Sequence, residues 1–229
     1  MSAVMFELEN VVPWGRSFDE YVEMFGLEGE TLTRLLGCGD GPAGFNADAT
    51  ARGWQVVSCD PLYRFSAGQI RGRIEAVRDE VLRQTRQDAE AFVWSRFRDV
   101  DHLAAVRTEA MEGFLADYPQ GQAEGRYVEA ALPSLPFADD SFDVALCSHF
   151  LFLYSSQFDL EFHLAAVREL LRCAARVRIF PLLQLGGARS PHLDALCREL
   201  RRDGVRVSLA TTPYEFQRGG NERLDLTRC

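Results

Sequence analysis

Short apolar runs alternate with amphipathic stretches along most of the chain. Brief apolar runs bounded by polar or turn residues are typical of buried strands, and they occur at 31–36, 54–59, 127–132, 142–148 and 176–180. Helical spacing lies between them, as at 17–25, where Ser17 and Glu20 form a capping box. This alternation predicts an α/β fold with a mostly parallel sheet covered by helices.

Residues of about 64–120 break this rhythm with helical patterns alone. Ser66 and Gln69 form a second capping box. One apolar stripe then consists of Ile70, Ile74, Val77 and Val81, and another of Leu103, Val106, Ala110, Phe114 and Tyr118. We therefore expect a helical insertion between the second and third strands of a single domain that spans residues 1–229.

The last part of the chain predicts a helix followed by a hairpin. Ser190 is placed to cap a helix that begins at Pro191 and stops at Gly204. Strand patterns follow at 205–209 and 223–227, joined by a loop that contains Gly219 and Gly220. Because the loop between these two strands is too short for a parallel crossover, we expect them to form an antiparallel hairpin at the sheet edge.

Composition narrows the class of protein. Hydrophobic residues make up 47% of the chain and charged residues 26%, but no apolar run approaches the roughly 18 residues of a membrane span. Residues 1–9 lack the basic and apolar regions of a signal peptide, so we expect a cytoplasmic protein. The six cysteines form no CxxC pair, and neither a zinc site nor a disulfide is expected.

The charge argues against nucleic acid as a partner. The net charge is −9, whereas affinity for phosphates depends on clustered cations. All 25 basic residues are arginine. Because the chain has no lysine, any mechanism that needs a catalytic lysine is excluded.

Three candidate groups stand at predicted strand ends, which is where open parallel sheets bind ligands. The first is the glycine run at 36–44, whose bare backbone and following helix N-terminus suit close approach of a ligand. The second is Asp60, whose carboxylate could accept hydrogen bonds from both hydroxyls of a ribose. The third is the pair Ser148 and His149. Together they favour a nucleoside-binding site.

A dinucleotide is one alternative ligand. Gly39, Gly41 and Gly44 satisfy the GxGxxG pattern of such sites. Two observations weigh against NAD, however. The sheet is expected to end in a hairpin rather than a second parallel half, and without lysine the Tyr/Lys pair of the commonest short dehydrogenases cannot form.

The order of elements resembles that of the class I S-adenosylmethionine-dependent methyltransferases over essentially the whole chain apart from the insertion. The residues that carry the resemblance are LGCGDG at 36–41, Asp60 at a strand end, LPFADDSFDVALCSHFLF at 135–152 and YEFQRGGNERL at 214–224. The resemblance implies a Rossmann-like three-layer sandwich whose seven-stranded sheet has an antiparallel last strand. It also implies S-adenosyl-L-methionine as the cofactor.

The resemblance further implies a set of cofactor contacts. Asp60 would bind the ribose, and Arg16 and Tyr21 would lie at the methionine carboxylate. The other residues implied in cofactor binding are Gly37, Gly39 and Gly41 at the methionine and ribose, Pro61, Leu62, Ala131 and Leu132 around the adenine, and Ser148. His149 is the candidate general base for an acceptor that arrives protonated.

These observations predict a methyltransferase that acts on a small-molecule acceptor, without nucleic acid or membrane as a partner. Leu35 and Ala131 stand where the family often has acids, which motivates an alternative: a non-catalytic binding protein with the same fold. The insertion is expected to shape the acceptor pocket. The acceptor, the methylated atom and the oligomeric state stay open at the level of sequence.

Overall fold

The computed structural model describes residues 12–30 and 34–228. In chain order the elements are α1 (Phe18–Phe25), β1 (Arg34–Cys38), α2 (Phe45–Ala51), β2 (Gln55–Cys59), the short 3-10 helix η2 (Pro61–Arg64), α3 (Ala67–Gln87), the 3-10 turn η3 (Ala89–Ala91), α4 (Val100–Ala123), β3 (Tyr127–Val128), β4 (Phe142–Ser148), α5 (Leu160–Cys173), β5 (Ala174–Phe180), α6 (Leu193–Arg202), β6 (Val205–Thr211) and β7 (Glu222–Arg228).

Within these ranges the strands form one seven-stranded sheet in the order β3-β2-β1-β4-β5-β7-β6. The strands from β3 to β5 are parallel, and β7 lies between β5 and β6 and runs antiparallel to both. Strand order reverses between β1 and β4, because the chain builds outward from β1 in one direction and then returns to start β4 beside it. The predicted fold class, with its terminal hairpin, is confirmed.

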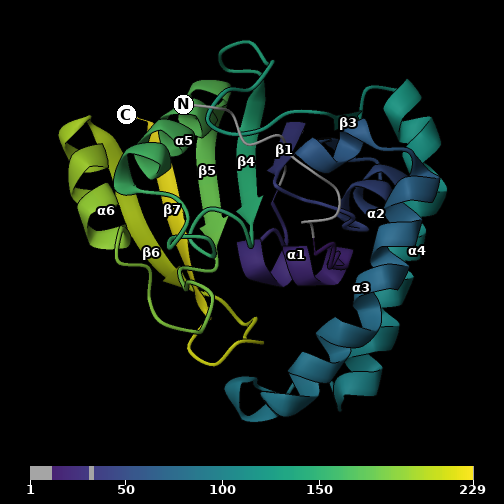
Figure 1. Cartoon of the computed structure of the whole chain (residues 1–229). Coiled ribbons are helices and arrows are strands. Elements are labelled where there is room, and N and C mark those ends of the chain that lie inside the picture. The colour runs from purple at the N-terminus through teal and green to yellow at the C-terminus, as the bar shows by residue number, and fades with distance from the viewer. Residues whose placement is uncertain (1–11, 31–33, 229) are drawn as a thin grey trace.

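Helices cover both faces of the sheet and complete the three layers (Figure 1). On one face α5 and α6 pack on the strands through Val167, Leu170 and Leu196. On the other face α1 and α2 bury Phe25 and Phe45 against Leu35 and the neighbouring strands. The central strand β4 is apolar on both sides because helices lie over each of them.

The predicted insertion between β2 and β3 is present and consists of η2, α3, η3 and α4. The capping box of Ser66 and Gln69 starts α3, and Asp99 caps α4 by accepting a hydrogen bond from the His102 N–H at 2.7 Å. Ile70 and Ile74 of α3 pack with Phe114 and Tyr118 of α4 in an apolar cluster that also takes in Leu62. None of the described helices is long and apolar enough to cross a membrane.

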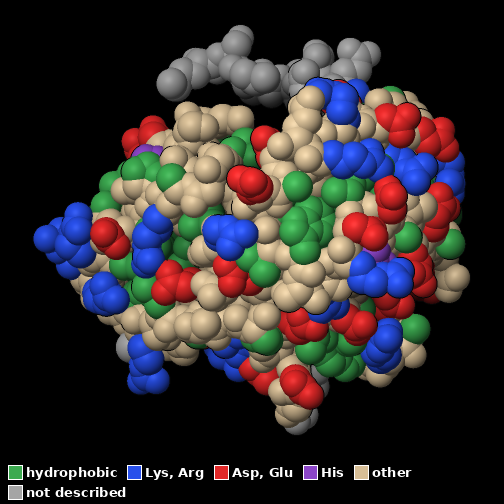
Figure 2. Space-filling view, turned by 90° about the horizontal axis from the view of Figure 1, so that it is seen from below, with side chains coloured by type: hydrophobic (Ala, Val, Ile, Leu, Met, Phe, Trp, Pro, Cys, Tyr) green, Lys and Arg blue, Asp and Glu red, His purple; other side chains and the backbone are tan. Residues whose placement is uncertain are grey.

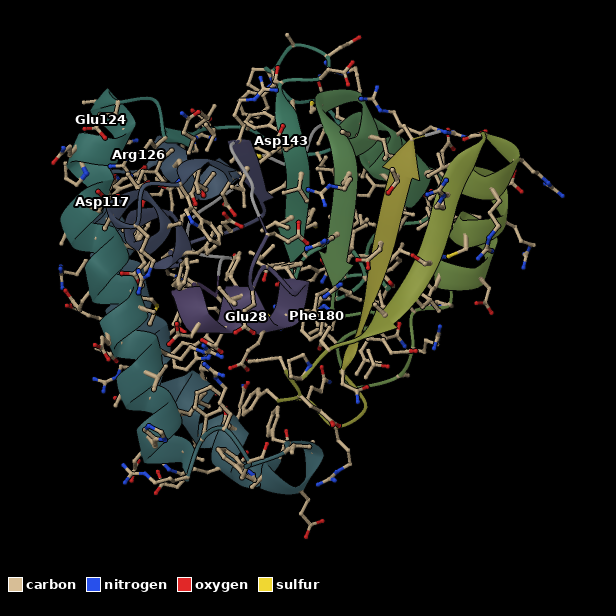
Figure 3. The ribbon with its side chains drawn as sticks, turned by 180° about the vertical axis from the view of Figure 1, so that it is seen from behind. Glu28, Asp117, Glu124, Arg126, Asp143 and Phe180 are labelled. Carbon is tan, nitrogen blue, oxygen red and sulfur yellow. The ribbon has the colours of Figure 1, made fainter. Side chains whose placement is uncertain are left out.

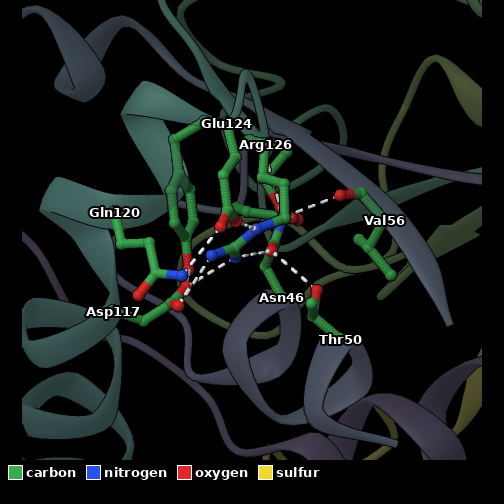
Figure 4. A network of polar contacts seen from close by, with 10 residues as sticks. Asn46, Thr50, Val56, Asp117, Gln120, Glu124 and Arg126 are labelled. Carbon is green, nitrogen blue, oxygen red and sulfur yellow. Dashed lines mark hydrogen bonds and ion pairs between the residues drawn. The ribbon is translucent and has the colours of Figure 1, made fainter. Parts of the chain in front are cut away.

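A polar network anchors the end of α4 to α2 (Figure 4). The Arg126 guanidinium donates two hydrogen bonds to Asp117 and one of 2.8 Å to Asn46 Oδ1. Asn46 in turn donates to the Val56 carbonyl of β2 and to Ser58 Oγ. The end of the insertion is therefore tied to α2, which follows the glycine turn at residues 39–44, and through Asn46 to β2.

The tip of the insertion meets the loop between β6 and β7. The Val93 N–H donates to the Phe216 carbonyl at 2.7 Å, and the Arg218 N–H donates to the Ala91 carbonyl at 2.9 Å. The rings of Phe92 and Phe216 stack with centroids 4.6 Å apart. In Figure 1 these segments lie beyond the carboxyl ends of the parallel strands, where α1 also crosses. Several elements therefore enclose this edge of the sheet.

Several predicted boundaries were wrong, including the start of β5, which is at Ala174 rather than 176, and the end of β6, which is at Thr211 rather than 209. β1 extends to Cys38, because Gly37 and Cys38 pair with β2 and β4. β3 ends at Val128 rather than at 132, because its partner β2 ends at Cys59 opposite Val128; the chain then turns where the Ser134 N–H donates to the Ala131 carbonyl. α6 begins at Leu193, after a turn in which the Ser190 carbonyl accepts from the Leu193 N–H. Residues 31–33 of the first predicted strand and the expectation for residues 1–9 lie outside the described residues.

Candidate functional site

The glycine turn follows β1 at the carboxyl edge of the sheet. Gly39 and Gly41 have φ values of 70° and 53°, a backbone conformation that glycine adopts without steric cost. The Gly39 N–H is fixed by the Cys59 carbonyl at 2.9 Å. A Cβ at Gly41 would meet nothing within 4 Å, whereas one at Gly39 would lie 2.9 Å from Phe150 Cβ. The turn is thus open beside Gly41 and closely packed beside Gly39.

Asp60 reaches this turn from the end of β2. Its Oδ2 accepts a hydrogen bond from the Gly41 N–H at 2.9 Å, and its Oδ1 accepts from the Leu62 N–H at 2.8 Å. Burial raises the pKa of Asp60 to about 6, although both backbone donors lower it. The residue is half-buried, so its remaining lone pairs can face a ligand. The structure therefore brings together the first two of the predicted groups.

A second carboxylate, Asp40, lies inside the turn and was not selected from the sequence. It accepts hydrogen bonds from the Tyr21 hydroxyl at 2.9 Å and the Ser58 hydroxyl at 2.6 Å. A Cβ at Gly37 would collide with this carboxylate. Gly37 lies within β1 and makes room for the Asp40 side chain; its implied contact with the ligand stays a prediction. The acid in LGCGDG was the available signal.

Burial raises the pKa of Asp40 to about 7, with a further contribution from Asp60. Between about pH 4 and pH 7 the folded protein therefore retains a proton that the unfolded chain has lost, and stability falls as the pH rises. We expect Asp40→Asn to remove the contribution of Asp40 to this slope, at most about 1.4 kcal/mol per pH unit, while Asp60, whose pKa is raised to about 6, still contributes below that pH. Urea unfolding of both proteins at several pH values measures the difference. Parallel stability curves would contradict the assignment.

Arg16 lies beside the turn, in the segment before α1. Its carbonyl accepts from the Gly44 N–H at 3.0 Å, and Gly15 has no room for a Cβ against the Pro42 carbonyl. The guanidinium donates to the Trp14 carbonyl at 3.3 Å, but its Nε is buried without a hydrogen-bond partner. In the described part of the chain no carboxylate forms an ion pair with it. Burial and then the charge of Arg107 lower the pKa of Arg16.

Ser148 is the last residue of β4, and His149 follows it at the same edge of the sheet. His149 has a φ of 50°, and its N–H donates to the Phe180 carbonyl at 2.7 Å. Phe180 is the last residue of β5 and lies close to α1, whereas Asp143, at the start of β4, lies at the opposite end of the strands (Figure 3). His149 Nδ1 lies 3.0 Å from Ser148 Oγ. Burial, followed by the charges of Arg16 and Arg107, lowers the pKa of His149 well below its usual value. The imidazole is therefore neutral at pH 7.

The four residues predicted to lie around the adenine differ in how exposed they are. Pro61 starts η2, but Leu62 is fully buried under α3 and α4. Leu132 is buried in the sheet core, while Ala131 is exposed. Both follow β3, whose Val128 carbonyl accepts from the Asp60 N–H at 3.2 Å. Of this group, Pro61 and Ala131 have surface to offer a ligand.

The sequence analysis also did not select two tyrosines near the turn, Tyr63 and Tyr154. The Tyr63 hydroxyl donates to the Gly41 carbonyl at 2.8 Å and holds the turn from the side of η2. Tyr154 is half-buried beside Phe150, and burial raises its pKa, with smaller effects from Arg16 and Asp60. Apolar-aromatic runs such as PLY and LFLY gave no sign that the Tyr63 hydroxyl holds the glycine turn or that Tyr154 lies beside Phe150.

A buried ionic cluster lies next to Arg16 and consists of Glu20, Arg107 and Tyr214. Glu20 and Arg107 are 0% exposed and form an ion pair, and the Tyr214 hydroxyl donates to Glu20 at 2.8 Å. The sequence held one signal for it. Arg107 falls on the apolar stripe of α4, four residues after Leu103, where a charge needs a buried partner.

Among known proteins, the chain is 32% identical over 223 residues to the uncharacterized protein MJ0045 of Methanocaldococcus jannaschii. The match covers 96% of this chain and 98% of that protein. The chain belongs to the family of MJ0045. No family model matches it.

Solved structures that resemble this member of the MJ0045 family include a SAM-dependent methyltransferase from Thermotoga maritima, with a TM-score of 0.48, 12% identity and coverage of 93% of this chain and 90% of that one. Magnesium protoporphyrin IX methyltransferase from Synechocystis, crystallised with SAH, also gives 0.48, with 15% identity over 93% and 81% of the two chains. TnmH gives 0.47 at 16% identity; the match covers 92% of this chain and 55% of TnmH.

Proposed function

We propose that this protein is an S-adenosylmethionine-dependent methyltransferase that acts on a small-molecule acceptor. The observation that carries the proposal is the line of groups along the carboxyl edge of β1, β2 and β4. A positive-φ glycine turn contacts the half-buried Asp60. Beside the same turn lies Arg16, whose guanidinium pairs with no carboxylate in residues 12–30 and 34–228. A nucleoside with a carboxylate-bearing tail fits this arrangement, with its ribose at Asp60 and its carboxylate at Arg16.

The residues present fit the cofactor. Asp60 would accept the ribose hydroxyls, and the open backbone at Gly41 would allow the ligand to approach closely. Of the two residues expected at the methionine carboxylate, the Tyr21 hydroxyl already donates to Asp40. Arg16 would therefore supply the positive charge at the methionine carboxylate, and its buried Nε–H, which has no hydrogen-bond partner, could donate to that carboxylate. Leu35 is buried among apolar side chains of α1 and α2, so Asp40 and Asp60 are the acids at this turn.

When bound, S-adenosylmethionine supplies an activated methyl group. The protein's part is to orient the two reactants and exclude water, and such positioning can contribute on the order of 7–11 kcal/mol. The neutral His149 imidazole could accept a proton from an acceptor, although its lowered pKa makes it a weak base. The insertion tip and the β6–β7 loop, which meet beyond this edge, would form the wall of the acceptor pocket.

The surface supports a small molecule rather than nucleic acid as the acceptor. Seen from the carboxyl edge, acidic and basic side chains are interspersed and no broad basic patch covers this face (Figure 2). The net charge of −9 opposes binding to phosphate backbones.

Calorimetric titration with S-adenosylmethionine and S-adenosylhomocysteine tests the proposal. We expect saturable one-site binding of both, followed by transfer of labelled methyl to a component of a metabolite mixture. If neither ligand bound, the proposed function would be refuted. If the protein bound both ligands but transferred no methyl group to any component of the mixture, the result would instead favour the non-catalytic binding protein.

A further inference from the structure

Arg107 joins three parts of the fold at a single carboxylate. It comes from α4 of the insertion and pairs with Glu20 Oε2 in α1. The Tyr214 hydroxyl of the β6–β7 loop donates to Oε1 at 2.8 Å, and the Ser17 N–H donates to Oε2 at 2.9 Å. Both oxygens of Glu20 are therefore engaged, and burial of the carboxylate is offset chiefly by Arg107, which holds the pKa of Glu20 at about 2.

Arg16 is placed to compete for the same carboxylate. It directly precedes the N-cap residue Ser17, and Glu20 is the third residue of the helix that Ser17 caps. The charges of Arg107 and Glu20 both act on the Arg16 guanidinium, the first lowering its pKa and the second raising it. Both guanidinium groups therefore lie within electrostatic reach of one carboxylate, but of the two only Arg107 forms an ion pair with it.

Two other acids in the described part of the chain, Asp40 and Glu23, already have partners of their own. Asp40 accepts hydrogen bonds from Tyr21 and Ser58, and Glu23 pairs with Arg96. His149 and Tyr214 carry no negative charge at neutral pH. Glu20 is therefore the carboxylate to which Arg16 would turn if Arg107 were absent.

We propose that Arg107 is a positioning residue of the binding site: by holding Glu20, it leaves the Arg16 guanidinium unpaired for the carboxylate of the ligand. This inference rests on the proposed function, which places the methionine carboxylate at Arg16. It explains why the buried Arg16 guanidinium near the glycine turn has no anionic partner among the residues that the structure describes. It also gives the helical insertion a direct role in ligand affinity, because Arg107 is one of its residues.

The test uses two probes, S-adenosylhomocysteine and 5′-methylthioadenosine, which share the nucleoside and the thioether but differ in the amino-acid end. In Arg107→Met, Arg16 is expected to pair with Glu20. Affinity for S-adenosylhomocysteine should then fall by about tenfold or more, while affinity for 5′-methylthioadenosine stays within about threefold of the wild type. Arg71→Met, which breaks an exposed ion pair between α3 and α4, is the matched control and should change neither affinity.

A second variant removes the competing carboxylate and keeps the proposal testable if Arg107→Met does not fold. Arg107→Met combined with Glu20→Gln retains a capping-box side chain, so the start of α1 is preserved. We expect it to bind S-adenosylhomocysteine nearly as the wild type does. An equal loss for both probes in Arg107→Met, or a folded double variant with a selective loss of S-adenosylhomocysteine, would overturn the proposal. If the wild-type protein bound neither probe, the proposed function itself would fail.

Discussion

Replacement of Gly39 by valine is expected to abolish binding of S-adenosylhomocysteine while the sheet still folds. Gly39 has a φ of 70°, which a β-branched residue adopts only with strain. Its Cβ would also lie 2.9 Å from the Cβ of Phe150, in the segment that follows β4. The turn must therefore shift, and it would carry the Gly41 N–H away from Asp60. Calorimetry and circular dichroism of the purified variant would measure binding and folding together.

Gly204→Val is the matched control for this prediction. Gly204 has a φ of 82°, but nothing lies within 4 Å of its added Cβ, and it precedes β6 at the opposite edge of the sheet. It should lower stability through backbone strain, by roughly 1–3 kcal/mol, and leave binding intact. Normal affinity in Gly39→Val would show that the glycine turn is only a connector between β1 and α2.

The second large effect is expected at Asp60. In Asp60→Ala, affinity for S-adenosylhomocysteine should fall roughly 10- to 100-fold, since hydrogen bonds to a charged acceptor contribute about 1.5–3 kcal/mol. The same carboxylate holds the Gly41 and Leu62 N–H groups, so part of the loss would come from a less ordered turn. Titration calorimetry at pH 8, above the pKa of about 6, measures the effect of removing the ionised carboxylate.

Asp60→Asn separates the two contributions. An asparagine oxygen can still accept one of the backbone hydrogen bonds, so the turn should be better ordered than in the alanine variant, but the negative charge is gone. We expect intermediate affinity. Unchanged affinity in a folded Asp60→Ala protein would remove Asp60 from the site, and the nucleoside end of the ligand would then have to bind elsewhere.

The sequence by itself determined the parts of this protein that depend on local chemistry and on strand order. The capping boxes at Ser17 and Ser66 formed because their hydrogen bonds lie within four residues of each other. Gly41 and Asp60 met because each follows a parallel strand, and consecutive strands of a βαβ unit end at the same edge. The terminal hairpin followed from the short link between its strands.

Only the tertiary structure decided how far the strands extend and which groups share a buried charge. β1 continues through Gly37 and Cys38 because β2 and β4 pair with it on both sides. Arg107 and Glu20 are 87 positions apart in the chain, and Glu20 and Tyr214 are 194 apart. A pattern of apolar positions shows that a charge will be buried, but its partner is fixed by packing between distant elements. The unpaired state of Arg16 follows from that packing, since it depends on Arg107 of the insertion reaching Glu20.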